Sequence, residues 1–268
     1  MRHSNNLQSE GRIRLVFFKS SLIAFLIFIF SPFGSIFLWS ICDSRYVIPG
    51  EAFRLTFGWY MTTWTMVSWW SAIAGTLILG IIVSSIAVVM AFVFCSVVWA
   101  QGRHMLAYLS PILILPIGIP WLVYAFGFSQ VFGLFTGTVW GVLVAQTAIG
   151  FFSSSIVLIF SYRSSDSTIL ASALSLGAGW WRSLFVALLP TKIAPLLTSW
   201  LLVLFLSIDD VFVVQIIGRA RIDTFTLKLW KAIRYDLSPE AAAASVLFLV
   251  LLGFLWLGSM LVKKRLPE

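Results

Sequence analysis

The chain has 268 residues, of which 60% are hydrophobic and only 10% are charged, and its mean hydropathy is +1.00. Soluble domains carry about 25% charged residues, so this composition excludes an ordinary soluble globule, a disordered chain and a collagen-like chain. The net charge of +8 includes no basic run longer than Lys263–Arg265, which argues against nucleic acid as a partner. The class that remains is an all-α, polytopic protein of a lipid membrane.

Six apolar stretches approach or exceed the length of about 20 residues that a membrane-spanning helix needs. They cover residues 15–41, 70–99, 105–128, 139–160, 193–217 and 241–262. The first is interrupted at Ser31–Gly34, and it is longer than the apolar region of about 7–15 residues in a signal peptide. We expect a single transmembrane domain over residues 15–262, with short tails at 1–14 and 263–268.

Basic residues near the span ends indicate the orientation, because they concentrate on the cytoplasmic side. With the N-terminus inside, 11 of the 18 Lys and Arg residues fall in inner segments and 7 in outer segments. Six spans then place both termini in the cytoplasm. The outer segment 218–240, which mixes basic and acidic residues, is expected to be mainly a solvated surface.

The third stretch carries Pro111, Pro116 and Pro120 together with Gly118. Proline has no backbone N–H, and the carbonyl groups that it frees are tolerated in a membrane only where neighbouring helices or a water-filled cavity satisfy them. Two interpretations stay open, a helix that lines or gates a translocation path and a helix that is kinked for packing. Under the first, Pro116 and Pro120 are candidate path residues.

The most informative segment is the inner one over residues 162–192, which is too long for a turn and too polar to span. Apolar residues recur at helical spacing in two runs, namely Ile169, Leu170, Ala173, Leu174 and Leu176, then Trp181, Leu184, Phe185 and Leu188. Gly177 separates the runs as a C-terminal glycine does, and Leu189–Pro190 ends the second. The pattern predicts helix, glycine, helix and proline before the fifth span.

This spacing resembles the EAA loop in the permease subunits of ABC importers. The family pattern is Glu-Ala-Ala, three residues, Gly, nine residues, Ile, one residue and Leu-Pro. Here Ala171–Ala173 stands at the first position, Gly177 at the second, Ala187 at the Ile position and Leu189–Pro190 at the end. Ala171 replaces the glutamate of the motif, so the carboxylate that would pair with an ATPase subunit is missing.

The resemblance extends over about residues 65–262 and is greatest to the second permease subunit of spermidine/putrescine-type importers. It is carried by the six spans, the proline-rich third span, the run Ser207–Phe212, and the segments Thr226–Lys228 and Ser238–Glu240. The resemblance implies the type I ABC importer fold, a place in the bacterial inner membrane and a role as a transport subunit rather than an enzyme.

The resemblance also implies partners. A short coupling helix in the loop would enter a groove of a cytoplasmic ATPase subunit, and the expected coupling residues are Leu170, Ala171, Ala173, Leu174, Gly177, Ala178, Leu189 and Pro190. The chain lacks a GxxxxGK[ST] phosphate loop, so ATP and Mg²⁺ would be held by two partner ATPase subunits. A second permease subunit, expected to be a different chain, and an extracytoplasmic solute-binding protein would complete the importer.

Asp209 and Asp210 are the acidic residues inside an apolar stretch. Ionisable groups within a span are costly and mark functional sites by default. One interpretation is that a carboxylate draws a cationic solute along a translocation path, and the other is that the pair caps a helix or binds a neighbouring backbone. The first favours a polyamine or a similar small cation as substrate.

Two other functions compete with the importer subunit. A self-sufficient secondary transporter or channel would need ion-coupling groups, and the candidates are only Asp209 and Asp210. A membrane enzyme would need a catalytic cluster, and the sequence contains neither a Gly-x-Ser-x-Gly motif nor an HExxH motif.

Overall fold

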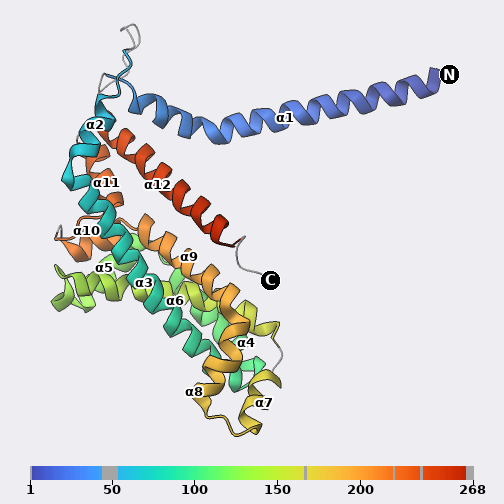
Figure 1. Cartoon of the computed structure of the whole chain (residues 1–268), viewed down its shortest axis with the longest axis vertical. Helices are drawn as coiled ribbons and strands as arrows, with labels where there is room; N and C mark the ends of the chain where they lie inside the picture. The colour runs from blue at the N-terminus through green and yellow to red at the C-terminus, as the bar shows by residue number, and fades with distance from the viewer. Residues whose placement is uncertain (1, 44–53, 166–167, 220, 236–237, 264–268) are drawn as a thin grey trace. The chain divides into compact units, whose positions relative to one another are not determined.

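The computed structural model describes the backbone of residues 2–43, 54–165, 168–219, 221–235 and 238–263. These residues form helices (Figure 1). Within the described ranges the β-structure is limited to one isolated antiparallel bridge between Cys42 and Leu55. The chain divides into two compact units, Met1–Val67 with Ala232–Glu268, and Ser68–Lys231. The predicted all-α class is confirmed.

The first unit consists of α1 (Arg2–Ser40), α2 (Gly58–Thr65) and α12 (Pro239–Lys263), with α12 packed against both others. The predicted interruption at Ser31–Gly34 is wrong, because α1 continues through Pro32. Pro32 has no N–H to donate to the carbonyl of Phe28, and the hydroxyl of Ser31 donates to that oxygen instead, at 2.8 Å. A local side-chain hydrogen bond therefore repairs the gap that the sequence suggested.

Helix α12 starts where the sequence predicts. The backbone N–H of Glu240 donates to Oγ of Ser238 at 3.1 Å, and Pro239 occupies the first helical position. Its apolar part among the described side chains, Pro239–Phe254, is shorter than a span. Over the described residues four helices are long enough to cross a membrane, or five if a bent pair is counted, so the six predicted spans are not confirmed as a number.

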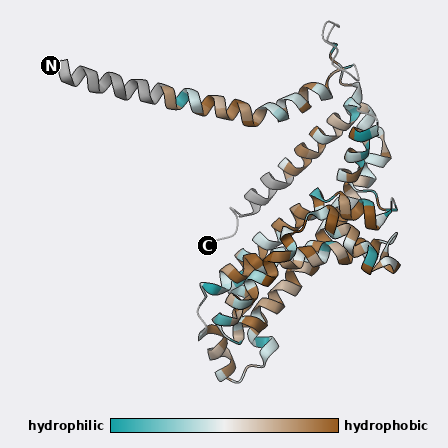
Figure 2. Cartoon of the chain, turned by 180° about the vertical axis from the view of Figure 1, so that it is seen from behind, coloured by the Kyte–Doolittle hydropathy of each residue, from teal (hydrophilic) through white to brown (hydrophobic). Residues whose placement is uncertain are grey.

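The second unit, Ser68–Lys231, holds most of the apolar helices. Its longer helices are α3 (Val67–Ala100), α4 (Arg103–Ile114), α5 (Trp121–Val131), α6 (Val139–Arg163), α9 (Ile193–Asp209) and α11 (Phe225–Tyr235). Its shorter elements are η1 (Leu115–Gly118), η2 (Gly133–Phe135), α7 (Thr168–Ser175), α8 (Trp180–Arg182), η3 (Ser183–Leu188), η4 (Leu189–Lys192) and α10 (Phe212–Gly218). Hydrophobic residues predominate along these helices (Figure 2), and the spans predicted at 70–99 and 139–160 are confirmed as α3 and α6.

Close packing joins α3, α6 and α9 at Gly150. A Cβ at this position would lie 2.7 Å from Cγ1 of Val203 and 3.0 Å from Cβ of Ala87. Membrane helices approach closely where one of them presents such a small residue. The small residue at position 150 therefore lets the three helices lie close together.

The outer segment 218–240 exposes Arg219, Arg221, Asp223 and Arg234, as expected of a solvated surface, and it also contains the helix α11. Phe225 and Leu227 at the start of α11 are buried, and the N–H of Phe225 donates to Oγ1 of Thr76 on α3 at 2.7 Å. Sequence reasoning gave weight to the charges of this segment and missed the apolar positions between them.

Candidate functional site

The inner segment forms the predicted helix–glycine–helix. Helix α7 ends in a Schellman motif, in which the N–H of Ala178 donates to the Ala173 carbonyl at 3.1 Å and the N–H of Gly177 to the Leu174 carbonyl at 2.9 Å. Gly177 adopts φ +79°, the left-handed region that glycine enters without strain. The chain then re-enters a continuous helical run from Trp180 to Asp209, and Figure 1 shows α7 and α8 at one end of the unit.

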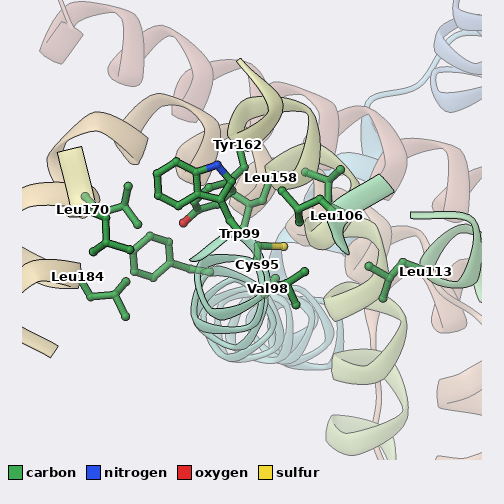
Figure 3. Packing of buried hydrophobic residues seen from close by; sticks show 13 residues of the cluster. Cys95, Val98, Trp99, Leu106, Leu113, Leu158, Tyr162, Leu170 and Leu184 are labelled. Carbon is green, nitrogen blue, oxygen red and sulfur yellow. The ribbon is translucent and has the colours of Figure 1, made fainter. Parts of the chain in front are cut away.

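The predicted coupling residues divide into a buried set and an exposed set. Leu170 is only 4% exposed and packs in the cluster that contains Trp99 and Leu184, where Figure 3 shows it beside Leu184. Leu174 is 39% exposed and Leu176, at the end of the motif, is 88% exposed. Of the other predicted residues, Ala171, Gly177 and Pro190 are exposed, and Ala173, Ala178 and Leu189 are half-buried. The exposed set, together with the exposed neighbour Leu176, is the part of the loop that is open to contact with a partner.

Lys192 fastens the return of the loop, although sequence reasoning counted it only as an inner basic residue. It is 2% exposed, and its Nζ donates to the carbonyl oxygen of Ser161 at 3.1 Å, to Oγ of Ser161 at 3.0 Å and to Oγ of Ser165. The Nζ also lies 4.4 Å from the centroid of the Tyr162 ring. Carbonyls at a helix C-terminus carry partial negative charge, so this ammonium group ties η4 to the last turn of α6.

The proline-rich third stretch is a broken helix, which counts as the predicted span only if its two bent parts are taken together. The run His104–Gly118 and the helix Trp121–Val131 meet at a bend of 95°. Ile119 is extended, with φ −78° and ψ 125°, because the ring of Pro120 disfavours a helical conformation in the residue before it. Pro116 is half-buried in η1, and Pro120 is exposed at the bend.

A second break separates α9 from α10, so the span predicted at 193–217 is found with other bounds, as the helical run Trp180–Asp209. Asp210 is extended at this break, with φ −74° and ψ 116°, and its carboxylate is buried. Oδ2 accepts a 2.7 Å hydrogen bond from Nε2 of Gln146, and Oδ1 accepts a 3.1 Å bond from the backbone N–H of Val213 in α10. Gln146 is itself held by the hydroxyl of Ser207 at 2.8 Å. Asp210 therefore caps and anchors the break.

The two breaks meet at one cavity. Asp209 and Asp210 line it together with Trp121, the residue that follows Pro120. The side chain of Asp209 is exposed, in contrast to that of Asp210. Of the predicted path residues, the two aspartates thus share a cavity, Pro120 adjoins it, and Pro116 does not line it. Discontinuous helices also form the substrate sites of many secondary transporters.

The helix arrangement resembles a solved transporter. A crystal structure of a bacterial ABC transporter involved in the import of the acidic polysaccharide alginate matches 95% of this chain and 97% of the matched chain, with a TM-score of 0.64 and 16% identity. The chain has the fold of an ABC importer permease. No family model matches the sequence.

Two curated relatives are similar in sequence. The spermidine/putrescine transport system permease protein PotC of Haemophilus influenzae is 22% identical over 166 residues, which cover 62% of this chain and 62% of PotC. The putrescine transport system permease protein PotI of Escherichia coli K12 is 27% identical over 99 residues, which cover 37% of this chain and 35% of PotI. The matches thus span less than two thirds of either relative.

These comparisons confirm the predicted resemblance to ABC importer permeases and, among them, to polyamine systems. The relatives are named as transport permeases, in agreement with the prediction of a transport subunit rather than an enzyme. The coupling residues and the path residues stay predictions, and so do the domain boundaries at residues 15 and 262.

Proposed function

We propose that this chain is the transmembrane permease subunit of an ATP-driven ABC importer and forms half of its translocation path. The observation that carries the proposal is the importer-permease fold over 95% of the chain. A second feature supports it, because the loop that resembles the EAA motif forms a short helix, a left-handed glycine and a returning helix at one end of the unit. An exposed helical hairpin of this kind is suited to receive motion from a second protein.

A polyamine or a similar small organic cation is the proposed solute. The two sequence relatives are named for spermidine and putrescine, and the cavity at the helix breaks contains a carboxylate, which attracts cations. The structural neighbour imports an acidic polysaccharide, so the fold by itself does not select the solute. The choice of a cation rests on the sequence relatives and on Asp209.

The proposal requires partners. Two cytoplasmic ATPase subunits would hold ATP and Mg²⁺. They would contact the exposed set of coupling residues on the loop, where Leu174 and Leu176 are exposed. A second permease subunit would supply the other half of the path, and an extracytoplasmic binding protein would deliver the solute. The proposed location of the chain is the bacterial inner membrane, with both termini in the cytoplasm.

Co-purification tests the proposal against a self-sufficient transporter or channel. The full chain is tagged at its C-terminus, expressed with the genes that adjoin its own, and purified in a mild detergent. An importer subunit is expected to bring an ATPase and a second permease with it. A chain that purifies alone and conducts or exchanges cations in liposomes would favour the secondary transporter or channel instead.

A further inference from the structure

The cavity between the two helix breaks has the composition of a cation site. It measures about 140 Å³, and aromatic rings line it from three elements, Trp121 of α5, Phe212 of α10 and Trp230 of α11. The rings of Phe212 and Trp230 lie edge to face, with centroids 6.2 Å apart and an angle of 65°. Aromatic faces attract ammonium groups, and tryptophan does so most strongly.

Asp209 supplies the negative charge in this cavity. Over the part of the chain that the structure describes, its carboxylate accepts no hydrogen bond and forms no ion pair, whereas Asp210 beside it is occupied by Gln146 and Val213. Asp209 is also the last residue of α9. The final carbonyls of a helix lack partners within the helix and carry partial negative charge, so the helix end adds to the attraction for a cation.

The lysines of α11 do not neutralise this carboxylate. Nζ of Lys231 lies 3.5 Å from Oδ1 of Asp223, and Nζ of Lys228 donates to Oγ of Ser68 at 2.6 Å. The Lys228 ammonium also lies 4.2 Å from the centroid of the Trp69 ring. Both lysine side chains of α11, the helix that contributes Trp230, are therefore directed to partners other than Asp209.

We propose that this cavity binds one primary ammonium group of a linear polyamine, with Asp209 as its counter-ion and the rings of Trp121, Phe212 and Trp230 around it. Pockets for drug-sized ligands have volumes of about 300–1,000 Å³, so a cavity of about 140 Å³ suits a smaller group such as the end of a polyamine. The inference deepens the proposed function, on which it rests for the identity of the solute. It names the groups that distinguish a charged amine from a neutral solute.

Equilibrium binding tests this site without transport. The full chain, with any subunits that accompany it, is placed in lipid nanodiscs without ATP and titrated with radiolabelled putrescine. An excess of 1,4-butanediol, which has the same chain length and no charge, is expected to leave binding unchanged. Competition by butanediol equal to that by unlabelled putrescine would overturn the proposal.

Substitutions then separate a charge interaction from simple packing. We expect Asp209→Asn to weaken putrescine binding by about tenfold and Trp230→Leu by about three- to tenfold, with Trp230→Phe between Trp230→Leu and the native chain. The matched controls are Asp43→Asn, an exposed carboxylate that does not line the cavity, and Trp140→Leu, an exposed tryptophan on α6. Both controls are expected to bind as the native chain does.

Two results would contradict the site. If Trp230→Phe and Trp230→Leu lose the same affinity for putrescine, the ring of Trp230 has a packing role only. If Asp209→Asn binds putrescine with native affinity, Asp209 is not the counter-ion. Each variant is compared only in its monodisperse fraction, and Asp209→Glu is expected to keep most of the affinity. Because no ATPase activity is measured, failure of this site leaves the importer proposal standing, and failure of co-purification leaves the binding result intact.

Discussion

Nε2 of Gln146 in α6 lies 2.7 Å from Oδ2 of Asp210, while the adjacent Asp209 is exposed. Two neighbouring carboxylates therefore have different surroundings, one saturated by hydrogen bonds and one open to a ligand. The sequence left capping and cation attraction as alternatives for the pair. The structure places Asp210 with the first, and we assign Asp209 to the second.

Asp210 is expected to be the residue of the pair that stabilises the protein. Asp210→Ala leaves the buried amide of Gln146 and the N–H of Val213 without their acceptor, at a cost of about 1–3 kcal/mol each at most. Asp210→Asn keeps Oδ1 as the acceptor for the N–H of Val213, and the Gln146 amide can turn over so that its Oε1 accepts from the new Nδ2–H. We expect the melting temperature to fall clearly for Asp210→Ala, little for Asp210→Asn, and hardly at all for Asp209→Ala. Equal melting temperatures for the two alanine variants would contradict this division.

Gly177 offers a sharp test of the loop, because a matched glycine lies two residues away. A Cβ at either Gly177 or Gly179 meets no atom within 4 Å. Gly177 has φ +79° whereas Gly179 has φ −63°, so only the first resists a side chain, by about 1–2 kcal/mol. Gly177→Ala is expected to reduce ATPase-coupled uptake per complex, and Gly177→Pro to abolish it. Gly179→Ala should have native uptake; a loss as large as that of Gly177→Ala would remove the conformational explanation.

Lys192 is expected to hold the returning limb of the loop in place. Lys192→Met keeps the apolar stem but removes the donors to Ser161 and Ser165, and hydrogen bonds to charged groups are worth about 1.5–3 kcal/mol. We predict faster amide hydrogen exchange over residues 180–192 and weaker coupling of ATP hydrolysis to uptake. Lys231→Met, which removes only a surface ion pair with Asp223, serves as the control. Unchanged amide hydrogen exchange in Lys192→Met would show that Lys192 does not hold this limb in place.

Leu174 and Leu170 are expected to fail in different ways. Leu174 is exposed on the loop, so Leu174→Asp should reduce the amount of ATPase that co-purifies while the melting temperature of the chain stays near native. Leu170 is buried, so Leu170→Asp should destabilise the chain itself, because a carboxylate enters an apolar cluster. Ala171→Ser is expected to affect neither property. Normal ATPase recovery with Leu174→Asp would show that this surface is not the coupling contact.

Local signals in the sequence were enough to predict the loop. The apolar spacing of residues 169–176 and the glycine at 177 act within one or two helical turns, and the structure confirms them as a helix and its Schellman end. The prediction that Leu189–Pro190 ends the second helix is wrong, because the helical run tightens to a 3₁₀ turn there and continues to Asp209. The start of α12 at Ser238–Pro239 follows from the same kind of local chemistry.

Features that depend on distant residues were not predictable in the same way. The ammonium of Lys192 meets the carbonyl of Ser161 only after the loop has folded back, and Gln146 in α6 meets Asp210 only where the end of α9 lies beside it. The break at Asp210 likewise depends on an amide 64 residues earlier in the chain. The sequence does carry two signals for these contacts, a lysine two residues after the Leu189–Pro190 pair and a lone glutamine in an apolar helix.

Uptake into proteoliposomes tests the central claim most directly. The chain is reconstituted with its second permease, its ATPases and its binding protein, and accumulation of radiolabelled putrescine is measured with ATP, without ATP and with a hydrolysis-deficient ATPase. The account predicts accumulation against a gradient only when ATP, an active ATPase and the binding protein are all present. Uptake by this chain alone, driven by an ion gradient and indifferent to ATP, would contradict it.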